Sequence, residues 1–156
     1  MRWWYMLCLS LVWIGQAQAV EWKDLGAVNS AVERFVEAMN RGEVAPAHRE
    51  LRAHLGVSLE AFDAAVRDTV ADMANLREQL GKPIGMVLVD KQAIGEDFYR
   101  LIYLQKYSSA AIVWELTFYR PLSTWLVVGV NYSADIDKLF QSVDVAPAAS
   151  SVPANP

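Results

Sequence analysis

The two histidines, His48 and His54, are the first side chains to consider for metal or acid–base chemistry. Six residues apart on a helix they differ by about 240° and point to different faces, whereas zinc ligands on one helix sit three or four residues apart. The one cysteine, Cys8, lies far from both in the sequence and does not complete a set of ligands. We therefore expect no metal and no other cofactor, and expect the histidines to lie at the surface or to take part in the packing of the short second helix.

Carboxylates in strand-like segments are the next candidates, because a carboxylate buried among apolar side chains has a raised pKa and can act as a base. Glu115 falls on a tyrosine-rich strand face, opposite Trp114, and Asp90 stands near a turn, where water reaches it. No serine lies in a Gly-x-Ser-x-Gly turn, and no glycine-rich phosphate loop is present. We expect no catalytic residue.

Arg100 has the surroundings that most favour a binding role. It shares one face of a strand-like segment with three apolar residues, which are Phe98, Ile102 and Leu104. A buried guanidinium needs a partner, since an unpaired buried charge costs several kcal/mol. Two interpretations stay open: a rim position with the head in water, or an anion anchor at a pocket mouth together with Trp114 and Arg120.

Helical periodicity dominates the first half of the chain. Apolar residues repeat every three or four positions over residues 24–40, and Gly42 follows as a helix end. Residues 46–55 predict a short second helix with Pro46 in its first turn. Ser58 is expected to be the N-cap of a long third helix that ends before Gly81.

From Ile84 onward the period changes to two, which indicates strands. The expected strands cover residues 85–91, 97–107, 111–120 and 124–132, and their short connections predict an antiparallel meander. The last of them is apolar on both faces, so we expect it to be central or covered on both sides.

One face of this sheet must meet the helices. Burial of one large apolar side chain contributes about 1.5–3 kcal/mol, so we expect the inner face to carry Phe98, Ile102, Trp114, Leu116 and Phe118. The opposite face is then rich in tyrosine, a residue that tolerates half-exposure. It is either an ordinary outer face or an interface with a partner protein or a second copy, formed by Tyr99, Tyr103, Tyr107 and Tyr119.

Helices followed by a four-stranded meander resemble the nuclear-transport-factor-2-like superfamily. The resemblance covers residues 27–132 and includes FVEAMNRGE at 35–43, WELTF at 114–118 and WLVVG at 125–129. It implies an α+β cone, with N-terminal helices packed on a curved four-stranded antiparallel sheet around a cavity. Short exported bacterial members of unknown function are the most similar. Enzymes of this superfamily place Asp, His or Tyr inside the cone, whereas the inner face expected here carries Arg100 and Arg120.

The first nineteen residues resemble a secretory signal peptide. Arg2 precedes an apolar run from Trp3 to Gly15, and Ala17-Gln18-Ala19 forms a small-x-small cleavage site. The run is shorter than the about 20 residues that span a bilayer. We expect cleavage after Ala19, a periplasmic or secreted protein without a membrane span, a single α+β domain over residues 20–142, and a disordered tail over 143–156.

Composition narrows the partners. Removing the leader takes away one of 14 Lys and Arg residues and none of the 18 Asp and Glu residues, which leaves a net charge of about −5. Since no run of basic residues can follow phosphates, we expect no nucleic-acid partner. We expect a non-catalytic domain that binds a small molecule or an unidentified protein. The alternatives are a cofactor-independent isomerase or cyclase, and a structural or assembly factor whose core is filled.

Overall fold

Three α-helices precede a four-stranded antiparallel sheet in the computed structural model, which describes residues 21–137 and 139–140. The elements are α1 (Leu25–Asn40), α2 (Val44–Leu51), a 3₁₀ turn η1 (Arg52–His54), α3 (Leu59–Leu80), β1 (Gly85–Ile94), β2 (Phe98–Lys106), β3 (Ala111–Tyr119) and β4 (Leu126–Ser133). The predicted α+β class and element order are confirmed. The expected leader (1–19) and tail (143–156) lie outside the described residues.

The helix ends follow the capping residues in the sequence. The Asp24 side chain accepts a hydrogen bond from the Ala27 N–H at 2.8 Å, and Ser58 Oγ accepts one from the Ala61 N–H at 3.1 Å. Gly42 ends α1 with φ of 77°, a left-handed conformation that glycine adopts freely. The second helix begins at Val44, earlier than expected, because Pro46 fits anywhere in the first turn.

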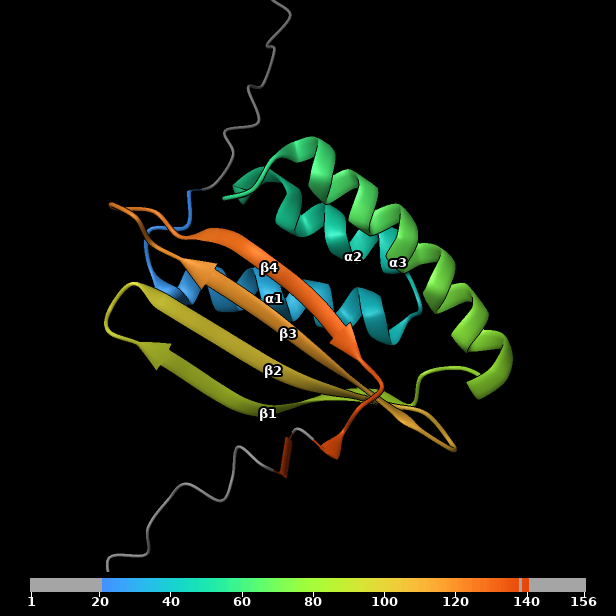
Figure 1. Ribbon diagram of the computed structural model, residues 1–156. Helices are drawn as coiled ribbons and strands as arrows, with labels where there is room; N and C mark the ends of the chain where they lie inside the picture. Colours follow the sequence, from blue (N-terminus) through green and yellow to red (C-terminus); the bar gives the residue numbers. More distant parts are fainter. Residues whose placement is uncertain (1–20, 138, 141–156) are drawn as a thin grey trace, which may run out of the picture.

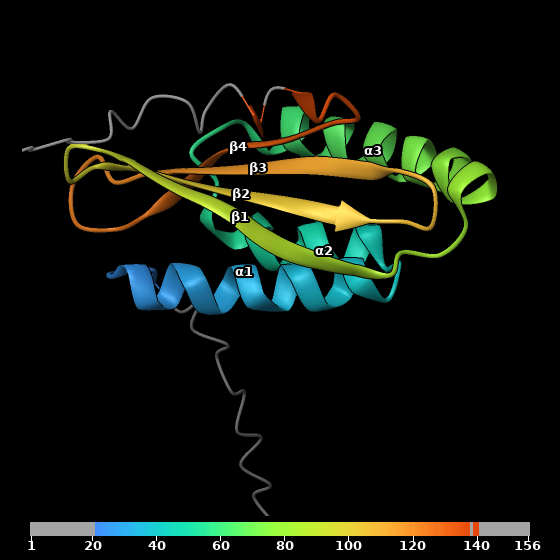
Figure 2. The same cartoon turned by 90° about the horizontal axis from the view of Figure 1, so that it is seen from below.

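The strands pair in sequence order, β1-β2-β3-β4, so β1 and β4 are the edges (Figure 1). α1 and α2 lie on one side of the curved sheet (Figure 2), and α3 runs alongside β4. Of the two alternatives expected for the fourth strand, the central position is therefore wrong. Of its apolar residues, Val127 is buried, and Leu126, Val128 and Val130 are partly buried.

The orientation of β2 also differs from the prediction. Directly paired residues of antiparallel strands lie on the same face, and β2 pairs Tyr103 with Trp114 and Tyr99 with Phe118. Because Trp114 and Phe118 are fully buried, the tyrosine face of β2 points toward the helices. Phe98, expected inside, is 40% exposed on the outer face. Alternation shows which residues of one strand share a face, but register decides which faces combine.

The core of the domain is aromatic and contains one buried polar chain. Phe35 on α1 meets Trp114 edge-on, with ring centroids 5.9 Å apart. The Trp114 indole N–H donates to Gln105 Oε1 at 3.0 Å, and Gln105 Nε2 donates to the Met39 carbonyl at 3.3 Å. Gln105 is only 1% exposed, so this chain links β3, β2 and the end of α1 inside the protein.

Replacing Gln105 with leucine tests the importance of this link. Gln105→Leu leaves the buried indole N–H of Trp114 without its acceptor, and we expect the free energy of unfolding in urea to fall by about 1–3 kcal/mol. The same change at the exposed Gln79 is the control and should stay within about 0.5 kcal/mol of wild type. Equal stability of the two variants would contradict the proposed role of the link.

Candidate functional site

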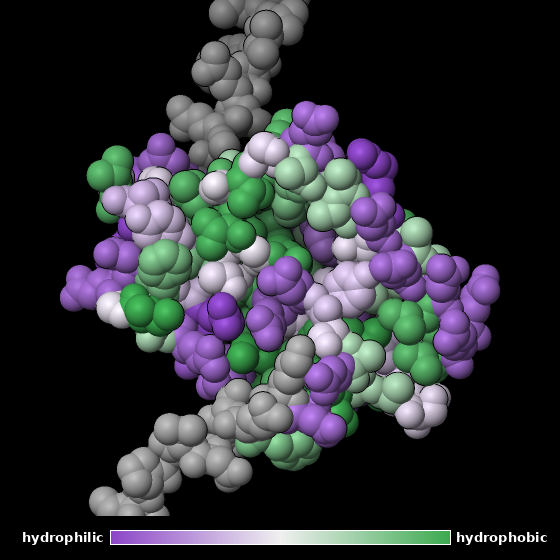
Figure 3. All heavy atoms as spheres, viewed as in Figure 1, coloured by the Kyte–Doolittle hydropathy of each residue, from purple (hydrophilic) through white to green (hydrophobic). Residues whose placement is uncertain are grey.

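A cleft of about 200 Å³ lies between α3 and β4. One wall is the N-terminal half of α3, the other is residues 127–130 of β4, and α2 contributes one histidine. Figure 3 shows apolar side chains gathered between these two elements. The lining consists of His48, Val57, Ala61, Phe62, Ala65, Val66, Thr69, Val127, Val128, Gly129 and Val130.

Two hydrogen bonds hold α3 and the loop before it alongside β4, one at each end of the cleft. Before the helix, the Gly56 N–H donates to the Val127 carbonyl at 2.8 Å. Further along, the Tyr132 hydroxyl of β4 donates a short hydrogen bond to Asp72 of α3. This bond raises the pKa of Tyr132 to about 12, so the hydroxyl keeps its proton at neutral pH. The cleft is the space that these contacts leave between the two elements.

Gly56 is the point of closest approach to β4. A Cβ atom there would lie 2.8 Å from Cγ1 of Val128 and 3.3 Å from Cβ of Leu126. Both distances are shorter than ordinary van der Waals contact between carbon atoms. The absence of a side chain at Gly56 therefore lets the loop before α3 reach the edge of the sheet.

His48 is the titratable residue of the cleft, and it is 3% exposed. Its Nδ1 donates to the Val44 carbonyl one helical turn earlier, at 2.8 Å. Burial lowers the pKa of His48 below its ordinary value of 6.5, against the opposing effect of this hydrogen bond. The ring is therefore neutral at neutral pH, with its proton on Nδ1.

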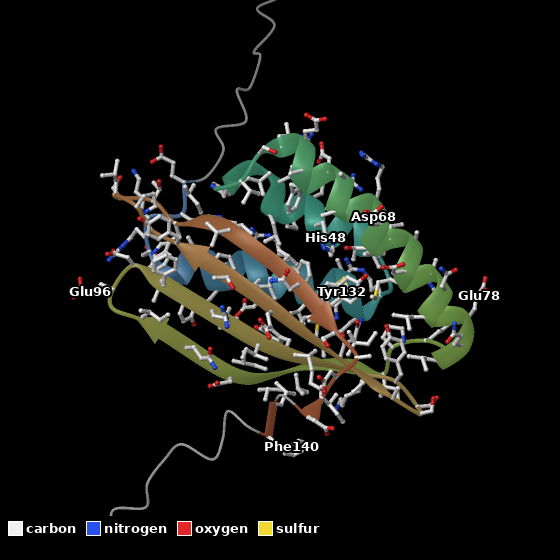
Figure 4. The ribbon with its side chains drawn as sticks, viewed as in Figure 1. His48, Asp68, Glu78, Glu96, Tyr132 and Phe140 are labelled. Atoms are coloured by element: carbon white, nitrogen blue, oxygen red, sulfur yellow. The ribbon has the colours of Figure 1, made fainter. Side chains whose placement is uncertain are left out.

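Aromatic rings surround His48. The centroids of Phe35, Trp114 and Phe62 lie 5.3, 6.1 and 6.3 Å from its own. His48 and Tyr132 both lie in the region between α3 and β4 (Figure 4). The sequence left two positions open for His48, the surface or the packing of the second helix, and the structure shows the packed position. The signal that points inward is the spacing from Val44 to His48 to Leu51, which puts the histidine on the apolar stripe of α2.

Thr69 on α3 is the second polar side chain of the lining and is also buried. Its hydroxyl donates to the Ala65 carbonyl at 2.8 Å, again one turn earlier in its helix. Nothing in the sequence singles out this residue, because a threonine in a helix carries no chemical signature. Its importance comes from its position opposite β4.

The three residues expected to bind a ligand do not come together. Arg100 is exposed on the outer face, where Nε donates to Thr117 Oγ1 at 3.3 Å and the guanidinium lies 3.9 Å from Glu115. Trp114 is buried on the opposite face of the sheet. Arg120 lies over the Trp125 ring at 5.1 Å and donates to the Glu96 carbonyl. Because β2 presents the opposite face to the helices from the one expected, Arg100 and Trp114 do not form the expected anion-binding site.

The four tyrosines expected at an interface are likewise divided. Tyr99, Tyr103 and Tyr107 pack against the core, and the Tyr99 hydroxyl donates to Asn29 Oδ1 on α1 at 3.4 Å. Tyr119 alone of the four lies on the outer face, where its ring stacks on Phe98 at 4.5 Å. These tyrosines therefore do not form one surface.

The described residues contain neither a candidate metal site nor a candidate membrane span. Over residues 21–137 and 139–140, no group of three or more His, Cys, Asp or Glu side chains is placed to hold a metal ion. Within the same residues, no helix has the length and apolar character needed to cross a bilayer.

The two strand carboxylates, Asp90 and Glu115, both lie on the outer face of the sheet. Each is paired with Ile102 of β2, Asp90 from β1 and Glu115 from β3.

No family model and no curated protein matches the chain. The solved structures that are similar to it include the following two. A DUF4783 family protein from Bacteroides ovatus ATCC 8483 is 11% identical with a TM-score of 0.40, over 64% of this chain and 90% of that chain. An NTF-2 like protein of unknown function from Silicibacter pomeroyi DSS-3 is 18% identical with a TM-score of 0.41, over 70% and 93%. Neither similarity assigns an activity to this chain.

The contact at Gly56 can be tested by adding one methyl group. We expect Gly56→Ala to lower the free energy of unfolding by about 1–3 kcal/mol, because Val128 and the backbone beside it must move. Gly129→Ala is the control, since its Cβ would meet Thr117 and Asn131 only at ordinary contact distances. If chemical denaturation shows equal stability for both variants, the close approach does not matter.

The burial of His48 predicts how stability depends on pH. The unfolded chain protonates this histidine near its ordinary pKa of 6.5, and the folded protein does so only at lower pH. The unfolded state therefore binds more protons as the pH falls below about 6.5, and the free energy of unfolding decreases in that direction.

His48→Phe should remove this contribution, so the free energy of unfolding should change less between about pH 7.5 and pH 5 than in wild type. His54→Phe is the comparison, because His54 has a lowered pKa but is less deeply buried. An unchanged pH dependence in His48→Phe, measured by urea unfolding, would show that the histidine is protonated equally in both states.

Proposed function

We propose that this domain binds a small apolar ligand in the cleft between α3 and β4 without covalent chemistry. The observation that carries the proposal is a cleft of about 200 Å³, partly open to solvent, whose lining consists almost entirely of apolar side chains. A dry apolar cavity of about 150 Å³ engineered into another protein binds benzene, whereas pockets for drug-sized molecules begin at about 300 Å³. The volume therefore fits one ring or a short branched chain.

The arrangement of large and small residues favours binding over a purely structural role. Phe35, Trp114 and Phe118 fill the interior between α1 and the sheet. In the cleft, by contrast, Ala61, Ala65 and Gly129 leave space between the helix and the strand. A purely structural domain needs no such opening, because larger side chains at these positions would bury more apolar surface and add stability.

The chemistry of the lining favours binding over catalysis. An isomerase- or cyclase-type reaction needs a base together with a group that stabilises the developing charge. Among the described lining residues, His48 is the one titratable group and no carboxylate accompanies it. Asp72 lies nearby on α3, but its carboxylate already accepts the hydrogen bond from Tyr132.

We further propose that the domain works outside the cytoplasm, as the leader-like residues 1–19 predict. A domain without cysteine after Cys8 needs no disulfide to remain stable there. N-terminal sequencing of the protein recovered from its host should find Val20 first. A protein that retains Met1 inside the cell would overturn this part of the proposal and leave ligand binding open.

A blocked cleft provides the direct test of binding. Toluene, titrated into ¹⁵N-labelled protein, should shift the backbone amide signals of residues 127–130. Ala65→Phe places a large ring in the lining of the cleft, so we expect it to weaken toluene binding about tenfold or more by steric exclusion.

The matched control is Ala71→Phe, on the same helix at an exposed position outside the lining. It should bind toluene as wild type does. The proposal fails if toluene leaves the amides of β4 unchanged in wild type, or if both variants bind it equally well.

A further inference from the structure

The cleft contains two polar side chains among its described lining residues, and both use their proton in the same way. His48 Nδ1 donates to the carbonyl of Val44, and Thr69 Oγ1 donates to the carbonyl of Ala65. Each carbonyl belongs to the same helix, one turn earlier. A carbonyl only accepts hydrogen bonds, so the direction of both bonds is fixed. The donor capacity of the two side chains is therefore used inside the protein.

What remains at the two side chains is acceptor capacity. A neutral imidazole with its proton on Nδ1 has a lone pair on Nε2, and a hydroxyl that donates once still has lone pairs on oxygen. Among the described residues, neither Nε2 of His48 nor a lone pair of Thr69 receives a hydrogen bond. Both residues line the cleft, so a ligand there meets acceptors and not donors from these side chains.

The charge of the lining restricts the ligand further. No Lys, Arg, Asp or Glu belongs to the described lining. A charged ligand would lose its hydration without gaining an opposite charge, which costs far more than one hydrogen bond returns. An anion would also meet the lone pairs of His48 and Thr69. The surroundings therefore favour a neutral molecule.

Building on the proposed binding function, we infer that the cleft selects a small neutral molecule with a hydroxyl or N–H group, which donates to Nε2 of His48 or to the hydroxyl oxygen of Thr69. The apolar part of such a molecule lies against Phe62, Val66 and the β4 wall. A phenol or a compact alcohol has this combination of shape and donor. A carboxylate of the same size does not.

Three probes of nearly equal size separate these possibilities: phenol has a donor, toluene replaces it with a methyl group, and benzoate carries a negative charge. Their affinities are measured by titration against the amide signals of residues 127–130. The informative quantity is the ratio of phenol affinity to toluene affinity, since both rings gain similar apolar contacts.

His48→Phe removes one acceptor and keeps a ring in the aromatic surroundings, and Thr69→Val removes the other with almost no change in shape. We expect the phenol-to-toluene ratio to fall about threefold to tenfold in at least one of these variants, as expected for the loss of one hydrogen bond. Thr69→Val keeps the test available if His48→Phe is unstable. Benzoate should bind wild type more weakly than either neutral probe.

The other outcomes separate the inferred selectivity for a hydrogen-bond donor from the proposed binding function itself. If toluene and phenol bind at the cleft but their ratio is unchanged in both variants, the inferred selectivity is wrong and binding stands. Benzoate binding as tight as that of phenol would also overturn the selectivity. If toluene does not shift the amides of β4, the proposed binding of an apolar ligand is wrong, and the selectivity that rests on it is overturned with it.

Discussion

The pairing of Tyr103 with Trp114 across β2 and β3 is the constraint on which the remaining architecture depends. It places the tyrosine face of β2 and the tryptophan face of β3 on one side, against α1. Trp114 then reaches Gln105 on the same face, and Gln105 reaches the end of α1 at Met39. A slip of one residue would turn every side chain of β2 to the other face and would leave the buried indole without its acceptor.

The cleft exists because α3 is held beside the sheet and not on it. Gly56 brings the start of the helix close to Val127, and Tyr132 holds its middle through Asp72. Between these contacts the facing residues are small, which are Ala61 and Ala65 on the helix and Gly129 on the strand. The cleft therefore forms because α3 and β4 are held close together at two points, while the facing residues between those points have small side chains or none.

The polar chemistry of the cleft follows from helix geometry. Histidine and threonine can both donate to the carbonyl one turn earlier, and in α2 and α3 they do so. Such bonds satisfy the donors in an apolar environment and leave acceptor lone pairs on two residues that line the cleft. On an exposed surface the same two side chains could donate hydrogen bonds as well as accept them. They would then not favour a ligand that donates over a ligand that accepts.

The sequence by itself determined the class of fold and most of its boundaries. Asp24, Gly42, Ser58 and Gly81 define the helix ends locally, through one side chain or one backbone conformation, and the change of period after Pro83 separates helices from strands. It also determined which residues share a face within β3, since alternation is a property of one strand.

Only the tertiary structure decided which face of each strand packs against the helices and which face lies on the outside. The outward position of Arg100, the inward position of Tyr99 and Tyr103, and the edge position of β4 all depend on strand register and order, which involve residues far apart in the sequence. The cleft around His48 depends on three elements at once, α2, α3 and β4. The periodicity within one segment does not show which segments lie side by side. The free energy that selects their arrangement comes from burial and strand pairing between segments and not from within them.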